Sequence, residues 1–207
     1  MRWIIAVAAT LVLAVAVGGV WLYTRAASTA TDPFEPCRAS TIAGGADQIG
    51  GPFELLNAEG KTVTDEDVIT EPTLLYFGYT FCPDVCPLDT VRNADAVDVL
   101  KGRGYDAQTV FISIDPERDT PEVVGDFAAN ISEDMIGLTG SPEQVRAASQ
   151  TYRTYFKKQP ADDEYYLVDH STFTYLVLPG HGFVEYFRRD MPPEQLAERA
   201  ACYIDRM

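Results

Sequence analysis

An apolar segment runs directly into a cysteine-containing loop in residues 73–87, TLLYFGYTFCPDVCP. The apolar run at 73–77 is typical of a central strand that is covered on both faces. A helical pattern follows the loop to about residue 100, where Gly102 and Gly104 end it. The sequence therefore predicts a strand-to-helix junction with Cys82 and Cys86 at the start of the helix.

The segments around this junction alternate between strand and helix patterns, which predicts an α/β domain. The other expected strands are 53–56 and 61–64 (a hairpin), 109–114, 165–168, 173–178 and 182–187. The other expected helices start at Thr120-Pro121, at Ser141 (reaching about residue 156) and at Pro193 (reaching residue 205). This order predicts a central mixed sheet flanked by helices, with a hairpin at one end.

Length and charge limit the possible functions. The chain has 207 residues and a formal net charge of −15, enough for one domain with an N-terminal extension. Such an acidic surface repels phosphate backbones, so no nucleic-acid partner is expected. Hydrophobic residues at 46% and aromatic residues at 11% exclude an intrinsically disordered chain.

The N-terminal run at 3–23 is apolar, with Thr10 as its only clearly polar side chain. A helix of this length spans ~30 Å, the thickness of a bilayer's hydrocarbon core, whereas a signal peptide has a shorter apolar region of ~7–15 residues. We expect an uncleaved single-pass anchor and flank at 1–30, a tether at 31–51 and an exported domain at 52–207. Cleavage near 28–30 is the alternative. The expected location is a bacterial inner membrane, with the C-terminal domain in the periplasm; a mitochondrial inner membrane is the less favoured alternative.

Cys82 and Cys86 predict redox or metal chemistry. A helix N-terminus stabilises thiolates, and a spacing of four residues places both sulfurs on one helical face. The pair could form a disulfide, exchange disulfides with another protein or hold a soft metal, and two inert buried thiols are the alternative. A zinc ribbon needs a second cysteine pair, and a c-type haem site needs Cys-x-x-Cys-His; the sequence has neither.

His170 follows a predicted strand, whereas His181 lies in a Pro-Gly-His-Gly turn and is expected to be solvated. If that strand ends at the edge of the sheet that carries the cysteine loop, two thiolates and one imidazole converge. Sulfur selects Cu(I) and the nitrogen helps to hold Cu(II), so this set suits copper. Asp115 lies at the same edge if the strands are parallel. Together with Asp84 it could then contact the two cysteines and tune their acidity. An ordinary polar loop is the alternative for Asp115.

Five segments together resemble the SCO/SenC family over about residues 50–187. They are FGYT at 77–80, CPDVCP at 82–87, ISIDPERDTP at 112–121, GLTG at 137–140 and VDHS at 168–171. The resemblance implies a thioredoxin-like fold, one N-terminal membrane anchor and a copper-binding domain at 52–207. It also implies Cys82, Cys86 and His170 as the ligands of Cu(I) or Cu(II). Many members have histidine where this chain has Phe81.

The resemblance further implies a copper chaperone for cytochrome c oxidase assembly, usually one that delivers to the binuclear copper centre of subunit II. The alternative is a membrane-tethered thiol-disulfide oxidoreductase, in which Cys82 and Cys86 form the redox-active pair and reduce the cysteines of the oxidase copper site. His170 favours the chaperone, because exchange between dithiols needs no third ligand. Another copper protein is also a possible partner.

Cys37 and Cys202 lie outside these motifs. The ends of compact domains are often close together, and an exported compartment allows a disulfide to persist. We therefore predict that Cys37 pairs with Cys202 and fixes the tether against the last helix. Two free thiols, an intermolecular bridge or a relay to the Cys82–Cys86 pair are the alternatives.

Overall fold

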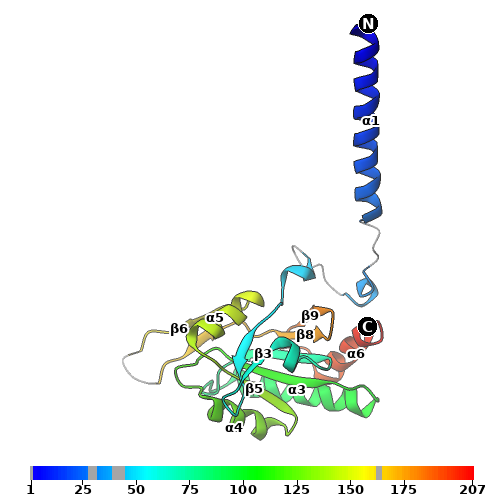
Figure 1. The fold of residues 1–207 in the computed structure, drawn as a ribbon. Coiled ribbons are helices and arrows are strands. Elements are labelled where there is room, and N and C mark those ends of the chain that lie inside the picture. Colours follow the sequence, from blue (N-terminus) through cyan, green and yellow to red (C-terminus); the bar gives the residue numbers. More distant parts are fainter. Residues whose placement is uncertain (1, 28–31, 39–44, 162–164) are drawn as a thin grey trace. The chain divides into compact units, whose positions relative to one another are not determined.

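The computed structural model describes residues 2–27, 32–38, 45–161 and 165–207. Two compact units make up the chain, Met1–Pro36 and Cys37–Met207. The first unit contains helix α1 (Arg2–Ala27), and the described strands belong to the second unit (Figure 1).

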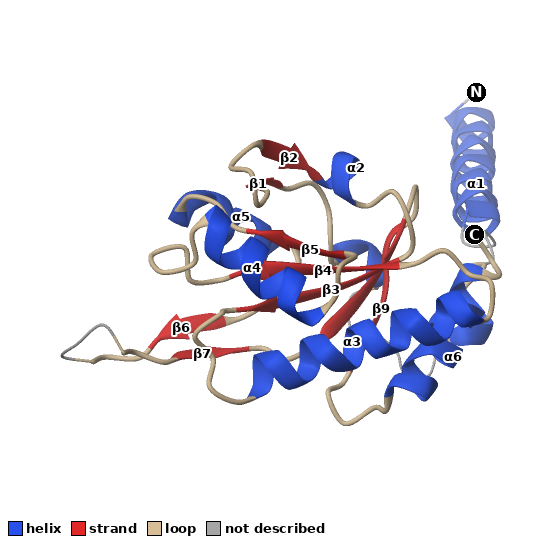
Figure 2. Cartoon of the chain, turned by 90° about the horizontal axis from the view of Figure 1, so that it is seen from below, coloured by secondary structure: helices blue, strands red, loops and turns tan. Residues whose placement is uncertain are grey.

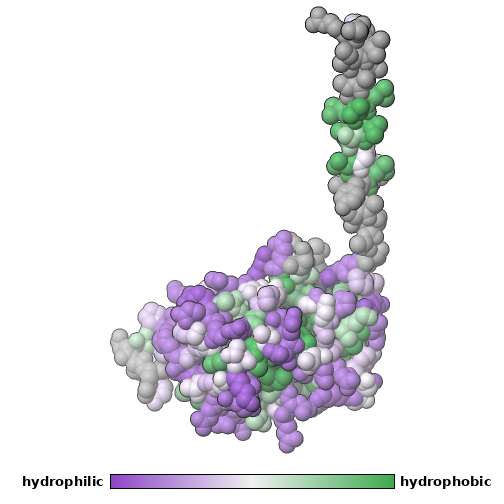
Figure 3. Space-filling view, viewed as in Figure 1, coloured by the Kyte–Doolittle hydropathy of each residue, from purple (hydrophilic) through white to green (hydrophobic). Residues whose placement is uncertain are grey.

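The described side chains of α1 between positions 11 and 22 are apolar and exposed for the most part (Figure 3). Within the described residues, however, no helix combines the length and hydropathy that crossing a bilayer requires. The membrane-spanning helix predicted at 3–23 is therefore not confirmed and stays a prediction. The visible face of the second unit is mainly hydrophilic, in keeping with the strong acidic charge of the chain (Figure 3).

A five-stranded mixed sheet forms the centre of the second unit, in the order β5-β4-β3-β8-β9. The strands are β3 (Thr73–Gly78), β4 (Gln108–Ser113), β5 (Met135–Leu138), β8 (Thr174–Leu178) and β9 (Gly182–Phe187). β3 pairs in parallel with β4, and β4 with β5, whereas β8 runs antiparallel to both β3 and β9. Every residue of β3 is buried, as the continuous apolar run at 73–77 predicts, and every residue of β4 is buried as well.

Helices flank this sheet, which confirms the predicted α/β class. They are α2 (Asp65–Val68), α3 (Val85–Gly102), α4 (Pro121–Ile131), α5 (Pro142–Thr151) and α6 (Pro193–Ile204). α3 packs against β3, β4 and α6, and α4 packs against β5 (Figure 2). The predicted starts of two helices are confirmed: the Thr120 side chain accepts a hydrogen bond from the backbone of Val123, and Ser141 forms a capping box with Gln144.

Two short hairpins lie outside the central sheet. β1 (Glu54–Leu56) pairs antiparallel with β2 (Thr62–Thr64), which confirms the predicted first hairpin. β6 (Phe156–Lys158) pairs antiparallel with β7 (Val168–His170), so His170 stands on a two-stranded sheet of its own. The 3-10 helices η1 (Glu35–Cys37) and η2 (Ala46–Gln48) precede β1.

Several sequence predictions were wrong in detail. The strand expected at 165–168 instead begins at Val168, because Tyr166 turns to hydrogen-bond with Asp115 rather than joining a sheet. β5 and β6 were not predicted, because both strands are too short to show a clear period. α5 ends at Thr151 rather than near 156, since the chain turns at Arg153, which has a φ of 51°.

Candidate metal centre

The cysteine loop connects the end of β3 to the first turn of α3. The backbone N–H of Cys82 donates to the carbonyl of Tyr79 (3.2 Å), and the N–H of Cys86 donates to the Sγ of Cys82 (3.4 Å). Gly78 allows this close packing, because a Cβ at that position would lie 2.9 Å from the Sγ of Cys86. The loop therefore places both sulfurs against the end of the central sheet, where they are buried.

His170 approaches the sulfurs from β7. Its Nε2 lies 3.4 Å from the Sγ of Cys86, and its Nδ1 lies 2.8 Å from the carbonyl oxygen of Ser171. A carbonyl only accepts hydrogen bonds, so Nδ1 carries the proton and the lone pair of Nε2 faces the sulfurs. This is the tautomer in which Nε2 can bind a metal ion.

The two sulfurs and the imidazole nitrogen all lie within 4.8 Å of one another. A three-coordinate ion with bonds of about 2.0–2.3 Å separates its ligand atoms by about 3.5–4.0 Å. One ion could therefore contact all three atoms after small movements. The structure thus brings together Cys82, Cys86 and His170, the residues singled out in the sequence.

The two thiols differ in acidity. A hydrogen bond from the Cys86 thiol, with others from the backbone N–H groups of Asp84 and Cys86, lowers the pKa of Cys82. The hydrogen bond to Cys82 and burial raise the pKa of Cys86. Without metal, the hydrogen bond between the two sulfurs therefore favours a thiolate on Cys82 over one on Cys86.

Aromatic side chains that the sequence analysis did not single out surround His170. The rings of Tyr79 and Tyr76 meet the imidazole edge-on, at centroid distances of 5.8 Å and 6.3 Å. The hydroxyl of Tyr79 accepts a hydrogen bond from the backbone of Val168 (3.3 Å), and the hydroxyl of Tyr76 donates to Asp89 (3.0 Å). These contacts fix the orientation of the His170 imidazole. Both tyrosines lie close to the cysteine loop in the sequence, and that position is the signal from which their role could have been predicted.

The side chains of Asp84 and Asp115, which were expected beside the two thiols, make other contacts. The side chain of Asp84 is exposed and makes no capping hydrogen bond, and it is the backbone of this residue that contacts the Cys82 sulfur. The buried carboxylate of Asp115 accepts hydrogen bonds from Arg118 Nε and from the Tyr166 hydroxyl, both at 2.6 Å. Asp115 therefore lies at the expected edge of the sheet, where it holds a neighbouring arginine and tyrosine.

Asp119 connects the loop after β4 to the cysteine loop. Its role was not predicted from the sequence. Its carboxylate accepts hydrogen bonds from the Thr80 backbone (3.0 Å), the Thr80 hydroxyl (2.6 Å) and the Ser113 hydroxyl (2.5 Å). Burial raises the pKa of Asp119, and these hydrogen bonds oppose that shift. The residue holds the cysteine loop against the end of β4.

A disulfide joins Cys37 to Cys202, with an S–S distance of 2.06 Å and a Cα–Cα distance of 5.8 Å. The guanidinium of Arg199 donates a hydrogen bond to the carbonyl of Cys37 (3.3 Å), next to this bridge. Cys82 and Cys86 are free thiols in the structure. The bridge therefore attaches the segment before η2 to α6 and leaves the other two sulfurs available.

Residues 42–205 match the family described as SCO1/SenC. The chain belongs to the SCO1/SenC family. Protein SenC of Rhodobacter capsulatus is 53% identical to this SCO1/SenC chain over 175 residues, covering 84% of the chain and 79% of that relative.

Two solved structures extend the comparison. The crystal structure of Arabidopsis thaliana ScoI with copper bound has 40% identity and a TM-score of 0.72, covering 76% of this chain and 99% of that one. BsSco, described as having a disulfide switch and as a member of the Sco family of cytochrome c oxidase assembly proteins, has 26% identity and a TM-score of 0.59, covering 75% and 94%. The comparisons confirm the thioredoxin-like fold expected for an SCO1/SenC protein.

Proposed function

We propose that this protein is a copper chaperone that holds one copper ion through Cys82, Cys86 and His170. The observation that carries the proposal is the approach of two sulfurs and one imidazole nitrogen to within 4.8 Å of one another. Soft thiolates select Cu(I), and the nitrogen extends the site to Cu(II). The copper bound to Arabidopsis ScoI supports the same cargo here.

A site with three protein ligands suits delivery as well as binding. It leaves a coordination position through which a ligand from a client protein can enter before the first ligands leave. Cys82 has an exposed fraction of 7%, whereas Cys86 has none, so a client would reach copper from the Cys82 side. The client we propose is cytochrome c oxidase, at the binuclear copper centre of subunit II, with another copper protein as the alternative; the description of BsSco supports the oxidase.

We also propose that residues 1–30 attach the protein to a bacterial inner membrane, that 31–51 form the tether, and that 52–207 carry copper in the periplasm. The apolar run at 3–23 supports the attachment. The disulfide between Cys37 and Cys202 supports an exported domain, because disulfides persist mainly in oxidising compartments.

Replacing His170 by alanine tests the copper site. The His170→Ala variant should lose the nitrogen hyperfine coupling in the electron paramagnetic resonance spectrum of bound Cu(II), and its Cu(II) affinity should fall. His181→Ala is the matched control, because His181 lies in the exposed turn between β8 and β9 and should leave the spectrum unchanged. An unaltered Cu(II) spectrum in His170→Ala would exclude His170 as a ligand.

The adjacent sulfurs favour a second candidate function, thiol-disulfide exchange with the oxidase. The Cys82 thiolate would attack a client disulfide and form a mixed disulfide, and Cys86 would then displace the client sulfur. Two electrons pass to the client, which leaves with two reduced cysteines, and Cys82 and Cys86 become a disulfide. The lowered pKa of Cys82 and its position in the loop just before α3 suit the attacking role.

Oxidation should compete with copper binding. The copper-free Cys82–Cys86 pair is expected to oxidise reversibly to a disulfide, which removes both thiolates and abolishes Cu(I) binding. Titration of oxidised and reduced protein with Cu(I) against a chromophoric chelator measures the difference, and reduction should restore binding. Equal Cu(I) affinity in the two forms would contradict this expectation.

A further inference from the structure

The hairpin that carries His170 lies outside the sheet that positions the two cysteines. Among the described strands, β7 pairs with β6 alone, whereas Cys82 and Cys86 follow β3 of the central sheet. The distance from imidazole to sulfur therefore depends on side chains that hold the hairpin against the cysteine loop. The loop that follows β4, residues 115–119, supplies contacts to both.

Arg118 is the centre of these contacts. Its guanidinium carbon lies 3.6 Å from the ring centroid of Tyr166, 4.8 Å from that of Phe81 and 5.7 Å from that of Tyr79. Its Nε pairs with the buried carboxylate of Asp115 at 2.6 Å. A guanidinium is attracted to aromatic faces, and more strongly where water is excluded. One arginine thus contacts the cysteine loop through Phe81 and the hairpin segment through Tyr166.

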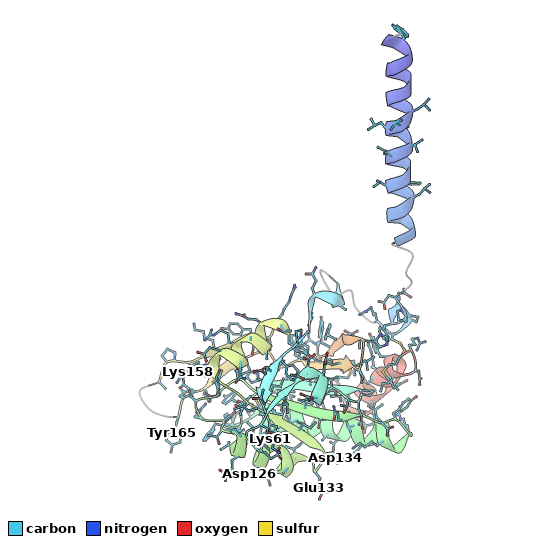
Figure 4. All side chains as sticks on the ribbon, viewed as in Figure 1. Lys61, Asp126, Glu133, Asp134, Lys158 and Tyr165 are labelled. Atoms are coloured by element: carbon cyan, nitrogen blue, oxygen red, sulfur yellow. A yellow bond between two sulfur atoms is a disulfide. The ribbon has the colours of Figure 1, made fainter. Side chains whose placement is uncertain are left out.

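The loop at 115–119 makes one further contact with the hairpin and one with the cysteine loop. On the hairpin side, Lys158 of β6 pairs with Glu117 at 2.5 Å and lies 3.7 Å from the ring centroid of Tyr166. Figure 4 labels Lys158 on the same side of the domain as Tyr165. On the cysteine side, Asp119 accepts two hydrogen bonds from Thr80. Lys158 and Glu117 are exposed, so their pair is weak, whereas Arg118 and Asp115 are largely shielded from water. Arg118 therefore links the two halves of the site from a largely buried position, beside the hydrogen bond from the Val168 backbone to Tyr79.

We propose that Arg118 is a positioning residue that keeps His170 within bonding distance of the copper held by Cys82 and Cys86. This inference rests on the proposed copper function. Two thiolates alone satisfy Cu(I), whereas Cu(II) needs the imidazole nitrogen. Arg118 therefore controls the balance between the two oxidation states of bound copper without contacting the metal.

Arg118→Ala in the full chain tests the proposal. The Cu(II) affinity should fall about 10–100-fold, the range found when residues that orient metal ligands are removed, and the nitrogen hyperfine coupling should weaken. Cu(I) affinity, measured against a chromophoric chelator, should stay near that of the wild type. Arg199→Ala is the matched control, since Arg199 also lies near a buried carboxylate, Glu185 (3.6 Å), but belongs to α6. It should change neither affinity.

Two results would overturn the role of Arg118. One is an unchanged Cu(II) affinity and spectrum in Arg118→Ala. The other is an equal loss of Cu(I) and Cu(II) binding together with a lower melting temperature, which would indicate a general structural role. Failure of the wild-type protein to bind copper at all would overturn the proposed function, and this inference with it, whereas either of the first two results leaves the copper function intact.

Discussion

Copper binding is expected to disappear when either Cys82 or Cys86 is replaced by serine. A serine hydroxyl stays protonated at neutral pH and is a hard ligand, so the variant offers one thiolate and one imidazole where Cu(I) needs two sulfurs. Copper bound per chain after desalting should fall from one equivalent to nearly none. The thiolate-to-Cu(II) charge-transfer absorption should vanish as well.

The double variant Cys37→Ser/Cys202→Ser is the control for this experiment, because it also removes two cysteines but leaves the site intact. It should still bind one equivalent of copper. Copper should further raise the melting temperature of the wild type by mass action, with about 2.7 kcal/mol of stabilisation when free copper is a hundred times its Kd. Wild-type copper loading of the Cys82→Ser/Cys86→Ser variant would show that the metal binds elsewhere.

Loss of the Cys37–Cys202 disulfide should cost more stability than removal of either site cysteine. The bridge joins residues separated by 165 positions, so it constrains nearly the whole unfolded domain. Removing a native disulfide typically costs about 2–5 kcal/mol, and long closed loops lie toward the upper end of the chain-entropy range. For a domain of this size the melting temperature should fall by about 5–20 °C.

Urea denaturation of the copper-free proteins measures this effect. The Cys37→Ser/Cys202→Ser variant should unfold at a clearly lower urea concentration than the wild type. The Cys82→Ser/Cys86→Ser variant retains the bridge and should unfold closer to the wild type. If the two double variants unfolded at the same urea concentration as the wild type, the bridge would not stabilise the domain.

Local patterns were sufficient to predict much of the fold. The apolar run at 73–77 identified β3, and Pro and hydroxyl residues at helix starts identified α4 and α5, because capping and burial depend on neighbouring residues. β5 and β6 were missed because strands of four and three residues show no reliable period, and β5 also forms through pairing with β4 across the intervening helix α4. The misplaced strand at 165–168 has the same cause, since the contact between Tyr166 and Asp115 joins residues 51 positions apart.

The sequence by itself determined which residues carry the chemistry. Cys82 and Cys86 lie four positions apart at a strand-to-helix junction, and His170 is one of only two histidines, so the choice of donor atoms was narrow. Only the tertiary structure decided how they meet. His170 reaches Cys86 across 84 positions from a separate hairpin, and the contacts of Arg118 that hold this hairpin are all long-range or within its own loop. The sequence specifies which side chains are present, whereas the distance between two ligands depends on how the elements between them pack.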